Sequence, residues 1–400
     1  MAKVAIMGYG TVGSGVYEII RRNSEKLRSN TYGEPVELKY ILDIRDFDDH
    51  PEKELFTKEF DEILNDEEVT VVAEVMGGLH PAYEFTKSLL QKGKNVTTSN
   101  KELVATYGSE LLAIARENNV NYMFEASVGG GIPIIHPMHQ CLVANNITRI
   151  AGILNGTTNY ILYQMIENGK SFETALADAQ ANGFAEKNPA ADVEGFDACR
   201  KIAILASLAS GKEINYNNIE TKGITEITLD DVVCAGEGNG VIKLIGYADM
   251  LENGKVYATV APMFISKGSP LAAVNDVFNA IMVTGDCVDD VMFYGKGAGK
   301  LATASAVVAD ILDCVRHRNS NKNIIWTKTE EPVEAGRDDV SFAYFVRSNN
   351  SVSEVNAAVK VDRFITEDDK SAFITDKMTE SEAEERLSKL DIITSLKVLG

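Results

Sequence analysis

The chain has 400 residues, of which 45% are hydrophobic and 24% are charged, and it carries a formal net charge of −20. At roughly 100–200 residues per domain, this length predicts two or three domains, and the composition excludes an intrinsically disordered chain. The acidic balance argues against nucleic acid or an anionic membrane as a partner. No stretch approaches the ~18 consecutive apolar residues of a membrane helix, and the apolar run before Gly8 is too short for a signal peptide.

The cysteines are odd in number, widely spaced and without a C-x-x-C pair. This pattern predicts reduced thiols in a cytoplasmic protein and argues against a disulfide framework or a zinc cluster. The five residues are Cys141, Cys199, Cys234, Cys287 and Cys314.

Short apolar runs alternate with longer helical patterns in the first 135 residues. Strand and helix repeated in this order predict a parallel sheet covered by helices. Pro81 suits the first turn of its helix, and Gly93 suits the position just past the end of that helix. The expected strands are residues 3–7, 36–43, 69–75, 95–98 and 120–126, and the expected helices are residues 11–28, 81–91 and 107–118.

A glycine-rich stretch at residues 128–133 marks the change to a middle region with a different pattern. We expect a last apolar helix near residues 301–318 to return to the first domain. The other elements expected here are a strand at 147–154, helices near 157–168, 172–182 and 195–210, and less regular strands through about residue 293.

The last 60 residues read as a separate small α+β unit. Thr379 and Glu382 have the spacing of a capping box at the start of a helix over residues 378–390. Residues 349–369 show no clear helix pattern. Strands are expected at residues 341–347 and 392–398, and the domains at residues 1–135, 136–320 and 340–400.

A G-x-G-x-x-G pattern lies directly after the first expected strand and opens the first helix. Gly8 makes the tight turn, Gly10 lets a pyrophosphate approach the backbone, and Gly13 allows close packing of helix on strand. The helix begins with Thr11 and Val12, whose unpaired N–H groups favour an anion. A glycine-rich turn of another α/β fold is the alternative, but the strands that follow favour a Rossmann-type dinucleotide-binding domain.

The choice between NAD and NADP stays open at this level. Asp43, at the end of the second strand, is placed to accept hydrogen bonds from an NAD ribose. Arg45 is placed instead to pair with a 2′-phosphate.

A lysine and three acids in residues 186–201 carry the strongest catalytic signal. Asp197 and Lys201 are four residues apart on one helix face, and the residues after Lys201 are apolar almost all the way round. A lysine at the start of a buried helix is partly desolvated and is a usable proton donor. Glu186 and Asp192 add negative charge suited to a ligand ammonium; the alternative is an ordinary ion pair on a helix surface.

Other segments have weaker signals. Lys101 follows the end of an expected parallel strand, where open α/β sheets bind ligands. Asn155 and Thr157 lie in a strand-to-helix loop that binds ligand or only caps the helix. The pair His136 and His139 has no third ligand nearby, so metal binding by it is not expected. A second glycine-rich turn, residues 294–299, meets the cofactor or simply turns the chain.

Six blocks of the sequence resemble homoserine dehydrogenase, in the form that lacks an aspartokinase domain, and cover about residues 1–320 in the same order. The C-terminal unit resembles an ACT regulatory domain at its two ends. The blocks are GYGTVGSG at 8–15, TTSNKELVA at 97–105, EASVGGGIPI at 125–134, GILNGTTNYIL at 152–162, AQANGFAEKNPAADVEGFDACRK at 179–201 and YGKGAGKLATASAVVADIL at 294–312.

The resemblance implies reversible, NAD(P)-dependent reduction of L-aspartate 4-semialdehyde to L-homoserine, in threonine, methionine and isoleucine biosynthesis. It implies a homodimer or tetramer built through the middle domain. By this similarity Lys201 is the proton donor and Lys101 assists it. The other implied residues are Glu186, Asp192, Asp197, Asn155 and Thr157 for the substrate; Gly8, Gly10, Thr11, Val12, Gly13, Asp43, Arg45, Gly77, Lys101, Gly297 and Gly299 for the cofactor; and Glu125 with the backbone of Val128, Gly130 and Ile132 for a monovalent cation, usually sodium.

Two other classes fit part of the pattern. One is another amino-acid oxidoreductase, such as an aspartate dehydrogenase, and the other is a dinucleotide sensor without catalysis. The lysine-and-acid set argues against the sensor, since a sensor needs no proton donor. An acylating semialdehyde dehydrogenase is disfavoured, because no cysteine lies in a convincing nucleophile loop.

Overall fold

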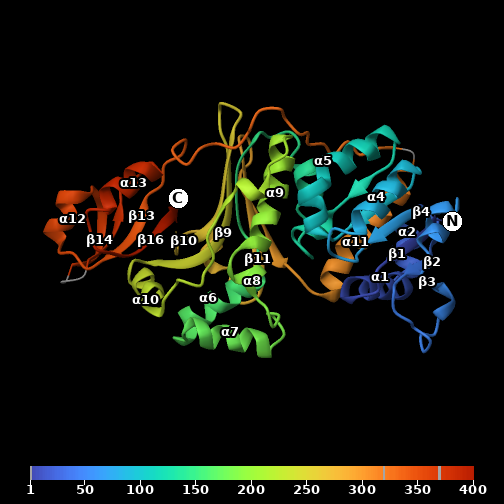
Figure 1. Ribbon diagram of the computed structural model, residues 1–400, viewed down its shortest axis with the longest axis horizontal. Helices are drawn as coiled ribbons and strands as arrows, with labels where there is room; N and C mark the ends of the chain where they lie inside the picture. The colour runs from blue at the N-terminus through green and yellow to red at the C-terminus, as the bar shows by residue number, and fades with distance from the viewer. Residues whose placement is uncertain (1, 319, 368–370) are drawn as a thin grey trace. The chain divides into compact units, whose positions relative to one another are not determined.

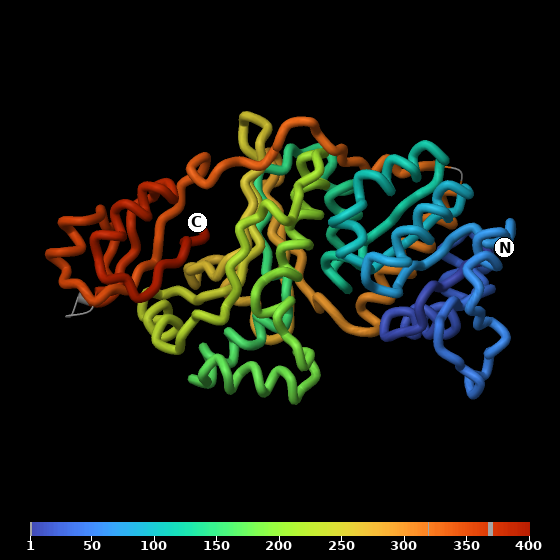
Figure 2. Tube along the Cα trace, in the orientation of Figure 1, coloured from blue at the N-terminus to red at the C-terminus, as the bar shows by residue number. Residues whose placement is uncertain are grey.

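The computed structural model describes residues 2–318, 320–367 and 371–400 (Figure 1). The chain divides into two compact units, each built from segments far apart in the sequence, and Figure 2 follows the chain through both. Unit 1 contains Met1–Asn145, Ala203–Asn215 and Gly295–Glu331, and unit 2 contains Asn146–Ile202, Tyr216–Tyr294 and Pro332–Gly400.

Unit 1 contains a six-stranded parallel sheet of the order β3-β2-β1-β4-β5-β6. The chain runs outward from β1 in one direction and then from β4 in the other, which is the Rossmann order and confirms the predicted fold class. The strands are β1 (Ala2–Met7), β2 (Val36–Leu42), β3 (Phe56–Thr57), β4 (Val69–Glu74), β5 (Asn95–Thr98) and β6 (Tyr122–Met123).

The helices of unit 1 differ from the expected ones at their ends. The helix expected at residues 11–28 is broken at Asn23, and α5 begins at Lys101 because the Asn100 side chain caps it by accepting from the Leu103 N–H. Helix α11 packs against α1, and Gly15 makes this approach possible, since a Cβ there would lie 2.7 Å from the Lys300 carbonyl oxygen. The helices are α1 (Thr11–Arg22), α2 (Ser24–Asn30), α3 (Phe60–Asn65), α4 (Ala82–Gln91), α5 (Lys101–Glu117) and α11 (Lys300–Arg316).

Unit 2 contains a mixed sheet with the strand order β12-β11-β7-β9-β10-β16-β13-β15-β14, and β8 pairs with β10 beside this path. The strands are β7 (Ile147–Ile153), β8 (Glu220–Thr221), β9 (Gly240–Met250), β10 (Val256–Ser266), β11 (Phe278–Gly285), β12 (Asp289–Lys296), β13 (Tyr344–Ser348), β14 (Val361–Glu367), β15 (Ser371–Thr375) and β16 (Ile392–Leu399).

The remaining helices belong to unit 2, except that α9 begins there and ends in unit 1. They are α6 (Gly156–Asn168), α7 (Phe172–Ala181), α8 (Ala190–Val193), α9 (Phe196–Ser210), α10 (Leu229–Glu237), α12 (Val352–Ala358) and α13 (Glu380–Leu387). Shorter helical turns of both units are Lys53–Leu55, Glu125–Ser127, Pro137–Cys141, Tyr216–Asn218 and Pro270–Ala273.

The C-terminal segment contains the elements β13, α12, β14, β15, α13 and β16 in this order. Helix α12 lies within residues 349–369, so the expectation that this stretch contains no helix is wrong. Helix α12 is short and buries only Val355, so the sequence shows no apolar periodicity there. Its start is nevertheless fixed by a capping box between Ser351 and Glu354. The capping box expected at Thr379 is confirmed.

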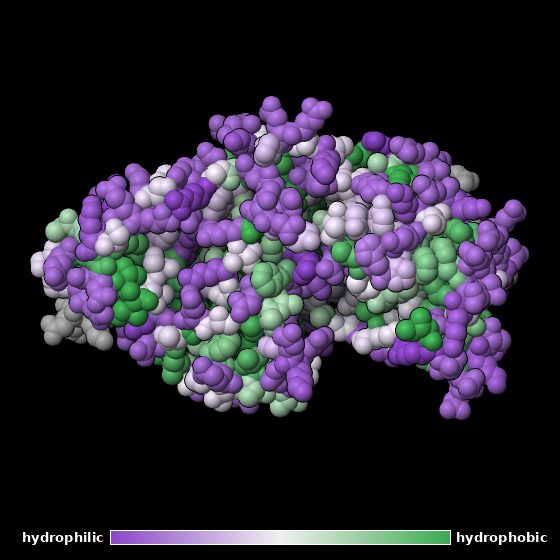
Figure 3. All heavy atoms as spheres, viewed as in Figure 1, coloured by the Kyte–Doolittle hydropathy of each residue, from purple (hydrophilic) through white to green (hydrophobic). Residues whose placement is uncertain are grey.

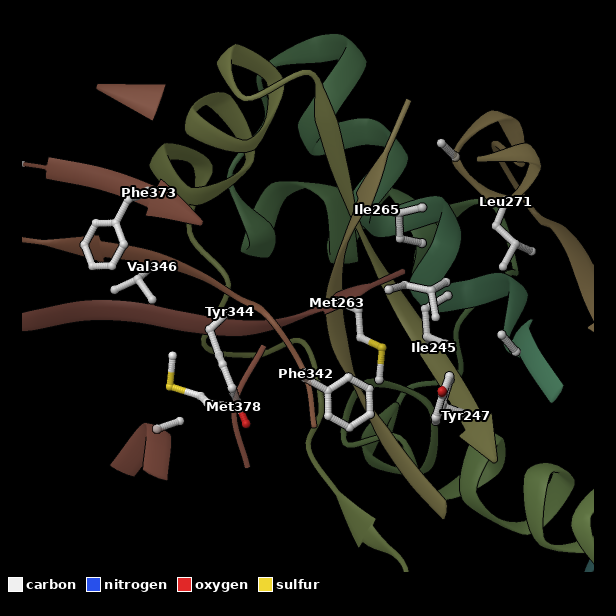
Figure 4. Close-up of a cluster of buried hydrophobic side chains, with 14 of the residues drawn as sticks. Ile245, Tyr247, Met263, Ile265, Leu271, Phe342, Tyr344, Val346, Phe373 and Met378 are labelled. Carbon is white, nitrogen blue, oxygen red and sulfur yellow. The ribbon is translucent and has the colours of Figure 1, made fainter. Parts of the chain in front are cut away.

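This segment does not stand apart from the middle region as expected. Strand β16 pairs with β10 in parallel, and both belong to unit 2. The C-terminal segment and the middle region share one hydrophobic cluster. In it, Phe342 and Tyr344 of the C-terminal segment accompany Met263 and Ile245 of the middle region (Figure 4). Burial of this shared apolar surface joins the two regions into one unit.

Hydrophilic residues cover much of the face in Figure 3, with smaller apolar areas between them. None of the helices in the part of the chain that the structure describes has the length and apolar character needed to cross a membrane.

Candidate active site

The glycine turn of unit 1 has the geometry expected of a phosphate-binding turn. Gly8 has a φ of +97°, and a Cβ at Gly13 would lie only 1.9 Å from the Gly8 carbonyl oxygen. Around Gly10, which precedes α1, a Cβ would meet nothing within 4 Å. The Gly10 backbone therefore adjoins open space just before Thr11 and Val12, the first residues of a helix, and a helix N-terminus favours an anion.

Asp43 and Arg45 form one pair beside this turn. Arg45 donates from Nε to Asp43 Oδ1 at 2.9 Å and from Nη2 to Oδ2 at 2.9 Å. The backbone N–H groups of Tyr9 and Arg45 donate to the same carboxylate, at 2.8 and 3.0 Å. The Arg45 guanidinium holds the pKa of Asp43 well below its usual range. The acceptor positions of Asp43 are thus engaged by protein donors, whereas the Arg45 side chain is 57% exposed.

The carboxyl ends of β1 and β4 meet at the point where the sheet order reverses, which is where such sheets bind ligands. Gly77 follows β4 with a φ of +80° and has open space around it. Glu74, which the sequence analysis missed, is fully buried, and it accepts hydrogen bonds from Thr98 Oγ1 at 2.6 Å and from the Met76 N–H at 2.8 Å. Burial raises the pKa of Glu74. The sequence signal that could have identified Glu74 is a single acidic residue at the end of an apolar run.

Lys101 is the first residue of α5, just past β5, and is half-buried. The preceding Asn100 fixes this start, because its Nδ2 donates to the Gly78 carbonyl at 2.6 Å while its Oδ1 caps the helix. Lys101 therefore lies just past the carboxyl end of β5, at the start of α5.

The second glycine-rich turn, residues 294–299, lies against the glycine-rich stretch at residues 128–133 that follows β6, which we call the crossover. A Cβ at Gly130 would fall 2.2 Å from the Gly297 carbonyl oxygen, and the Gly131 N–H donates to the Lys296 carbonyl at 3.1 Å. Gly299, with a φ of +125°, precedes α11. Gly297 and Gly299 thus belong to the same unit as the first glycine turn.

The predicted cation ligands fit an oxygen-donor site in part. The buried Glu125 carboxylate accepts from the Ile134, Ile135 and His136 N–H groups at 2.5, 2.8 and 2.7 Å, which leaves little free acceptor capacity. Among the described residues, the carbonyl oxygens that accept no hydrogen bond include those of Val128, Gly130 and Ile132. Carbonyl and carboxylate oxygens are the donors that hard cations prefer.

Asp310 was also missed by the sequence analysis. It is fully buried, accepts from His136 Nε2 at 2.7 Å and from the Glu125 N–H at 3.0 Å, and so joins α11 to the crossover. Burial raises the pKa of Asp310 to about 6. His136 is engaged here, and the described residues contain no cluster of His, Cys, Asp or Glu suited to a metal.

In unit 2, Lys201 lies near the start of α9 with its side chain 10% exposed. Its Nζ donates to the Leu154 carbonyl at 2.7 Å and lies 2.8 Å from Asp197 Oδ2. The rest of the helix is buried over Ile202–Ala206, as the apolar sequence predicts. The ammonium is therefore held in a fixed place by a carbonyl and a carboxylate.

Asn155 joins the acids of this cluster. Its Nδ2 donates to Asp192 Oδ1 at 2.7 Å and to Asp197 Oδ2 at 2.9 Å, while its Oδ1 accepts from the Thr158 N–H and caps α6. Three of the predicted substrate-binding residues, Asn155, Asp192 and Asp197, thus form one polar cluster with the predicted proton donor Lys201.

Glu186 and Thr157 are placed differently. The Thr157 hydroxyl donates to the Phe184 carbonyl at 2.6 Å, which ties down the loop that carries Glu186. Glu186 itself is exposed, and its carbonyl accepts from Gln180 Nε2 at 3.0 Å. Glu186 is thus a solvent-exposed acid two residues beyond a fixed point of the loop.

The parallel sheet order with its glycine turn, together with a buried lysine held by a carboxylate, defines a dinucleotide-dependent oxidoreductase. Comparison with known proteins narrows this class. The family model for homoserine dehydrogenase matches residues 133–312, and the model for its NAD-binding domain matches residues 8–125. The chain belongs to the homoserine dehydrogenase family.

Individual relatives lead to the same family. The homoserine dehydrogenase of Bacillus subtilis is 41% identical over 319 residues, covering 79% of this chain and 73% of that protein. The crystal structure of a homoserine dehydrogenase from Thiobacillus denitrificans has a TM-score of 0.90 at 32% identity and covers 100% of this chain and 98% of that one. A hyperthermophilic archaeal homoserine dehydrogenase mutant in complex with NADPH has a TM-score of 0.67 at 29% identity, covering 78% of this chain and 97% of that chain.

Proposed function

We propose that this chain catalyses the reversible, NAD(P)-dependent reduction of L-aspartate 4-semialdehyde to L-homoserine. The observation that carries the proposal is the buried ammonium of Lys201, held by Asp197 and the Leu154 carbonyl. A buried ion pair adds little stability on its own, so this placement favours a role in chemistry.

The nicotinamide cofactor supplies or accepts the hydride when bound. Lys201 donates the proton to the developing alkoxide of the substrate, and Lys101 assists by stabilising the same negative charge. A charged donor aimed at an oxyanion acts mainly in the transition state, so its loss lowers kcat more than it raises KM.

The acids of unit 2 would bind the substrate amino group. Asp192 and Asp197 share the Nδ2 of Asn155, which sets their spacing, and Glu186 would approach from the exposed loop. Thr157 would support this loop through its hydrogen bond to Phe184. Substrates without an amino group are therefore expected to react poorly.

For the cofactor, we propose that the pyrophosphate lies at Gly8–Gly13, and that Gly77, Gly297 and Gly299 leave room for the rest of the molecule. Arg45 would face the 2′-phosphate of NADP, because Asp43 is saturated by protein donors and offers no acceptor to a ribose hydroxyl. The NADPH complex of the archaeal relative supports the use of this cofactor in the family.

Sodium is the proposed cation at Glu125, Val128, Gly130 and Ile132, where it would brace the crossover between the glycine turns. The resemblance further supports a cytoplasmic homodimer or tetramer, joined through the middle region, that acts in threonine, methionine and isoleucine biosynthesis.

The test is homoserine-dependent reduction of NAD and of NADP in parallel, in sodium chloride and in choline chloride. Lys201→Met is expected to lower kcat by roughly 10²–10³-fold while the cofactor still binds. Lys397→Met is the matched control, because Lys397 is also buried in unit 2 and pairs with acids, Glu220 and Glu380, outside the candidate site.

A Lys201→Met enzyme with near-parental kcat would show that this lysine is structural. Cofactor binding without any homoserine turnover by the parent chain would favour the sensor instead. Equal rates with homoserine and its deaminated analogue would contradict the ammonium-binding role of the acids.

A further inference from the structure

A second buried lysine lies in unit 2, in the middle of β9. Lys243 is 1% exposed, inside a strand whose neighbouring residues are mostly apolar. Its Nζ donates to the Val274 carbonyl at 2.8 Å, to Asn159 Oδ1 at 3.0 Å and to Asn275 Oδ1 at 3.3 Å. The three N–H groups of an ammonium thus meet three oxygen acceptors.

All three acceptors are neutral. Among the described residues, no carboxylate forms a hydrogen bond with Lys243, and Glu167 of α6 is the charged group that favours its protonated form. Burial lowers the pKa of Lys243 to about 8. Because a buried charge without a counter-ion costs stability, the fold alone does not explain why an ammonium is kept here.

Asn159 is the hub of this arrangement. Its Nδ2 donates to the carbonyls of Val274, Asp276 and Phe278 at 3.1, 3.0 and 3.0 Å, while its Oδ1 accepts from Lys243. Lys243 and Asn159 together hold the segment between the short turn Pro270–Ala273 and β11 in one conformation.

The first turn of α6 rests on this segment. A Cβ at Gly156 would lie 2.7 Å from the Val277 carbonyl oxygen, so the two backbones touch closely. The Asn159 N–H donates to the Asn155 carbonyl at 3.3 Å, and the preceding Leu154 carbonyl receives the Lys201 ammonium. A continuous series of contacts therefore runs from Lys243 to Lys201.

We propose that Lys243 is a positioning residue for the reaction, which sets the place of Leu154, Asn155 and hence Lys201 through Asn159 and the first turn of α6. The proposal rests on the proposed function of Lys201 and adds to it. A displacement of about 1 Å at a reacting group costs up to roughly 10²-fold in rate, so a distant anchor of this kind is able to control turnover.

Lys243→Met tests the proposal, since it keeps the unbranched apolar stem, one atom shorter, and removes the ammonium with all three of its donors. The expected result is a 10–100-fold loss of kcat/KM for homoserine, with the Kd of the cofactor within two-fold of the parent. Lys94→Met is the matched control. Lys94 is also buried and, within the described part of the chain, donates to two backbone carbonyls, those of Asp66 and Val69, but it precedes β5 in unit 1. The control is expected to lose stability without losing homoserine kcat/KM.

Asn159→Ala provides a second variant, which breaks the link to α6 and leaves two acceptors for the ammonium. If the contacts act as one series, the variant that carries both Lys243→Met and Asn159→Ala loses no more kcat/KM than the single variant with the larger loss. An active parent whose folded Lys243→Met variant retains kcat/KM within two-fold would overturn this role and leave the proposed function intact; should that variant not fold, the same result with Asn159→Ala overturns it. A parent without homoserine turnover would instead remove the proposed function.

Discussion

Two alanine substitutions three residues apart in the glycine turn are expected to act on different properties, Gly10→Ala on cofactor binding and Gly13→Ala on stability. Gly10 has a φ of −80°, which alanine adopts freely, and its added Cβ would meet nothing within 4 Å. Alanine restricts the unfolded chain and so stabilises by about 0.4–1 kcal/mol, and its poorer fit before a helix offsets a similar amount. Gly10→Ala should therefore change the free energy of unfolding by less than about 1 kcal/mol.

The same methyl group fills the space through which a pyrophosphate reaches the backbone. Losing one hydrogen bond to a charged group costs about 1.5–3 kcal/mol, which raises Kd roughly 10–100-fold. Gly10→Ala is thus expected to fold like the parent and bind the dinucleotide poorly.

Gly13→Ala acts on the fold instead. Its Cβ would lie 1.9 Å from the Gly8 carbonyl oxygen, roughly 1.5 Å inside an ordinary van der Waals contact. Because this neighbour is backbone, relief requires the turn or α1 to move, and overpacking of this kind costs typically 1–3 kcal/mol or more.

Guanidinium denaturation measures the free energy of unfolding of each variant. Fluorescence titration with reduced cofactor measures the Kd of the dinucleotide. A Gly10→Ala protein with the parental Kd would show that the pyrophosphate does not lie at this turn. A Gly13→Ala protein of parental stability would refute the packing argument.

Three further outcomes are expected. Arg45→Ala should raise KM for NADP at least about tenfold and leave KM for NAD within about two-fold, as initial rates with each cofactor would reveal. Because the pKa of Asp43 is depressed in the folded state, Asp43→Asn should lower the free energy of unfolding at pH 7, and denaturant titrations should show this difference shrinking as pH falls below about 3.9. Thiol titration at pH 8 should detect Cys141 and Cys287 in the native protein and all five cysteines after denaturation, since the other three are buried; a native count of five would contradict the core packing.

Features that depend on near neighbours in the chain were predictable. The turn from β1 into α1 follows from three glycines at fixed spacing, and the pairing of Asp197 with Lys201 follows from one turn of helix. The capping box at Thr379 is equally local. Each of these needs only the geometry of a few consecutive residues.

Pairings between distant residues were not predictable in this way. The sequence presents Asp43 and Arg45 as competing signals, yet in the folded chain the Asp43 carboxylate accepts from the Tyr9 N–H, 34 residues away, while it pairs with Arg45. Asp310 and Glu125 are 185 residues apart, and their contact depends on how α11 packs. Periodicity carries no information about such distances.

The chain alone therefore establishes a parallel α/β domain with a glycine turn and a helix that places a lysine beside an acid, because hydrogen bonding and steric limits along a short segment suffice for these. The contacts between residues far apart in the sequence are decided by the tertiary structure. Asn155 holds Asp192 and Asp197 together, and β16 extends the sheet at β10, because burial of apolar surface and completion of hydrogen bonds select among many arrangements that local preferences leave equal.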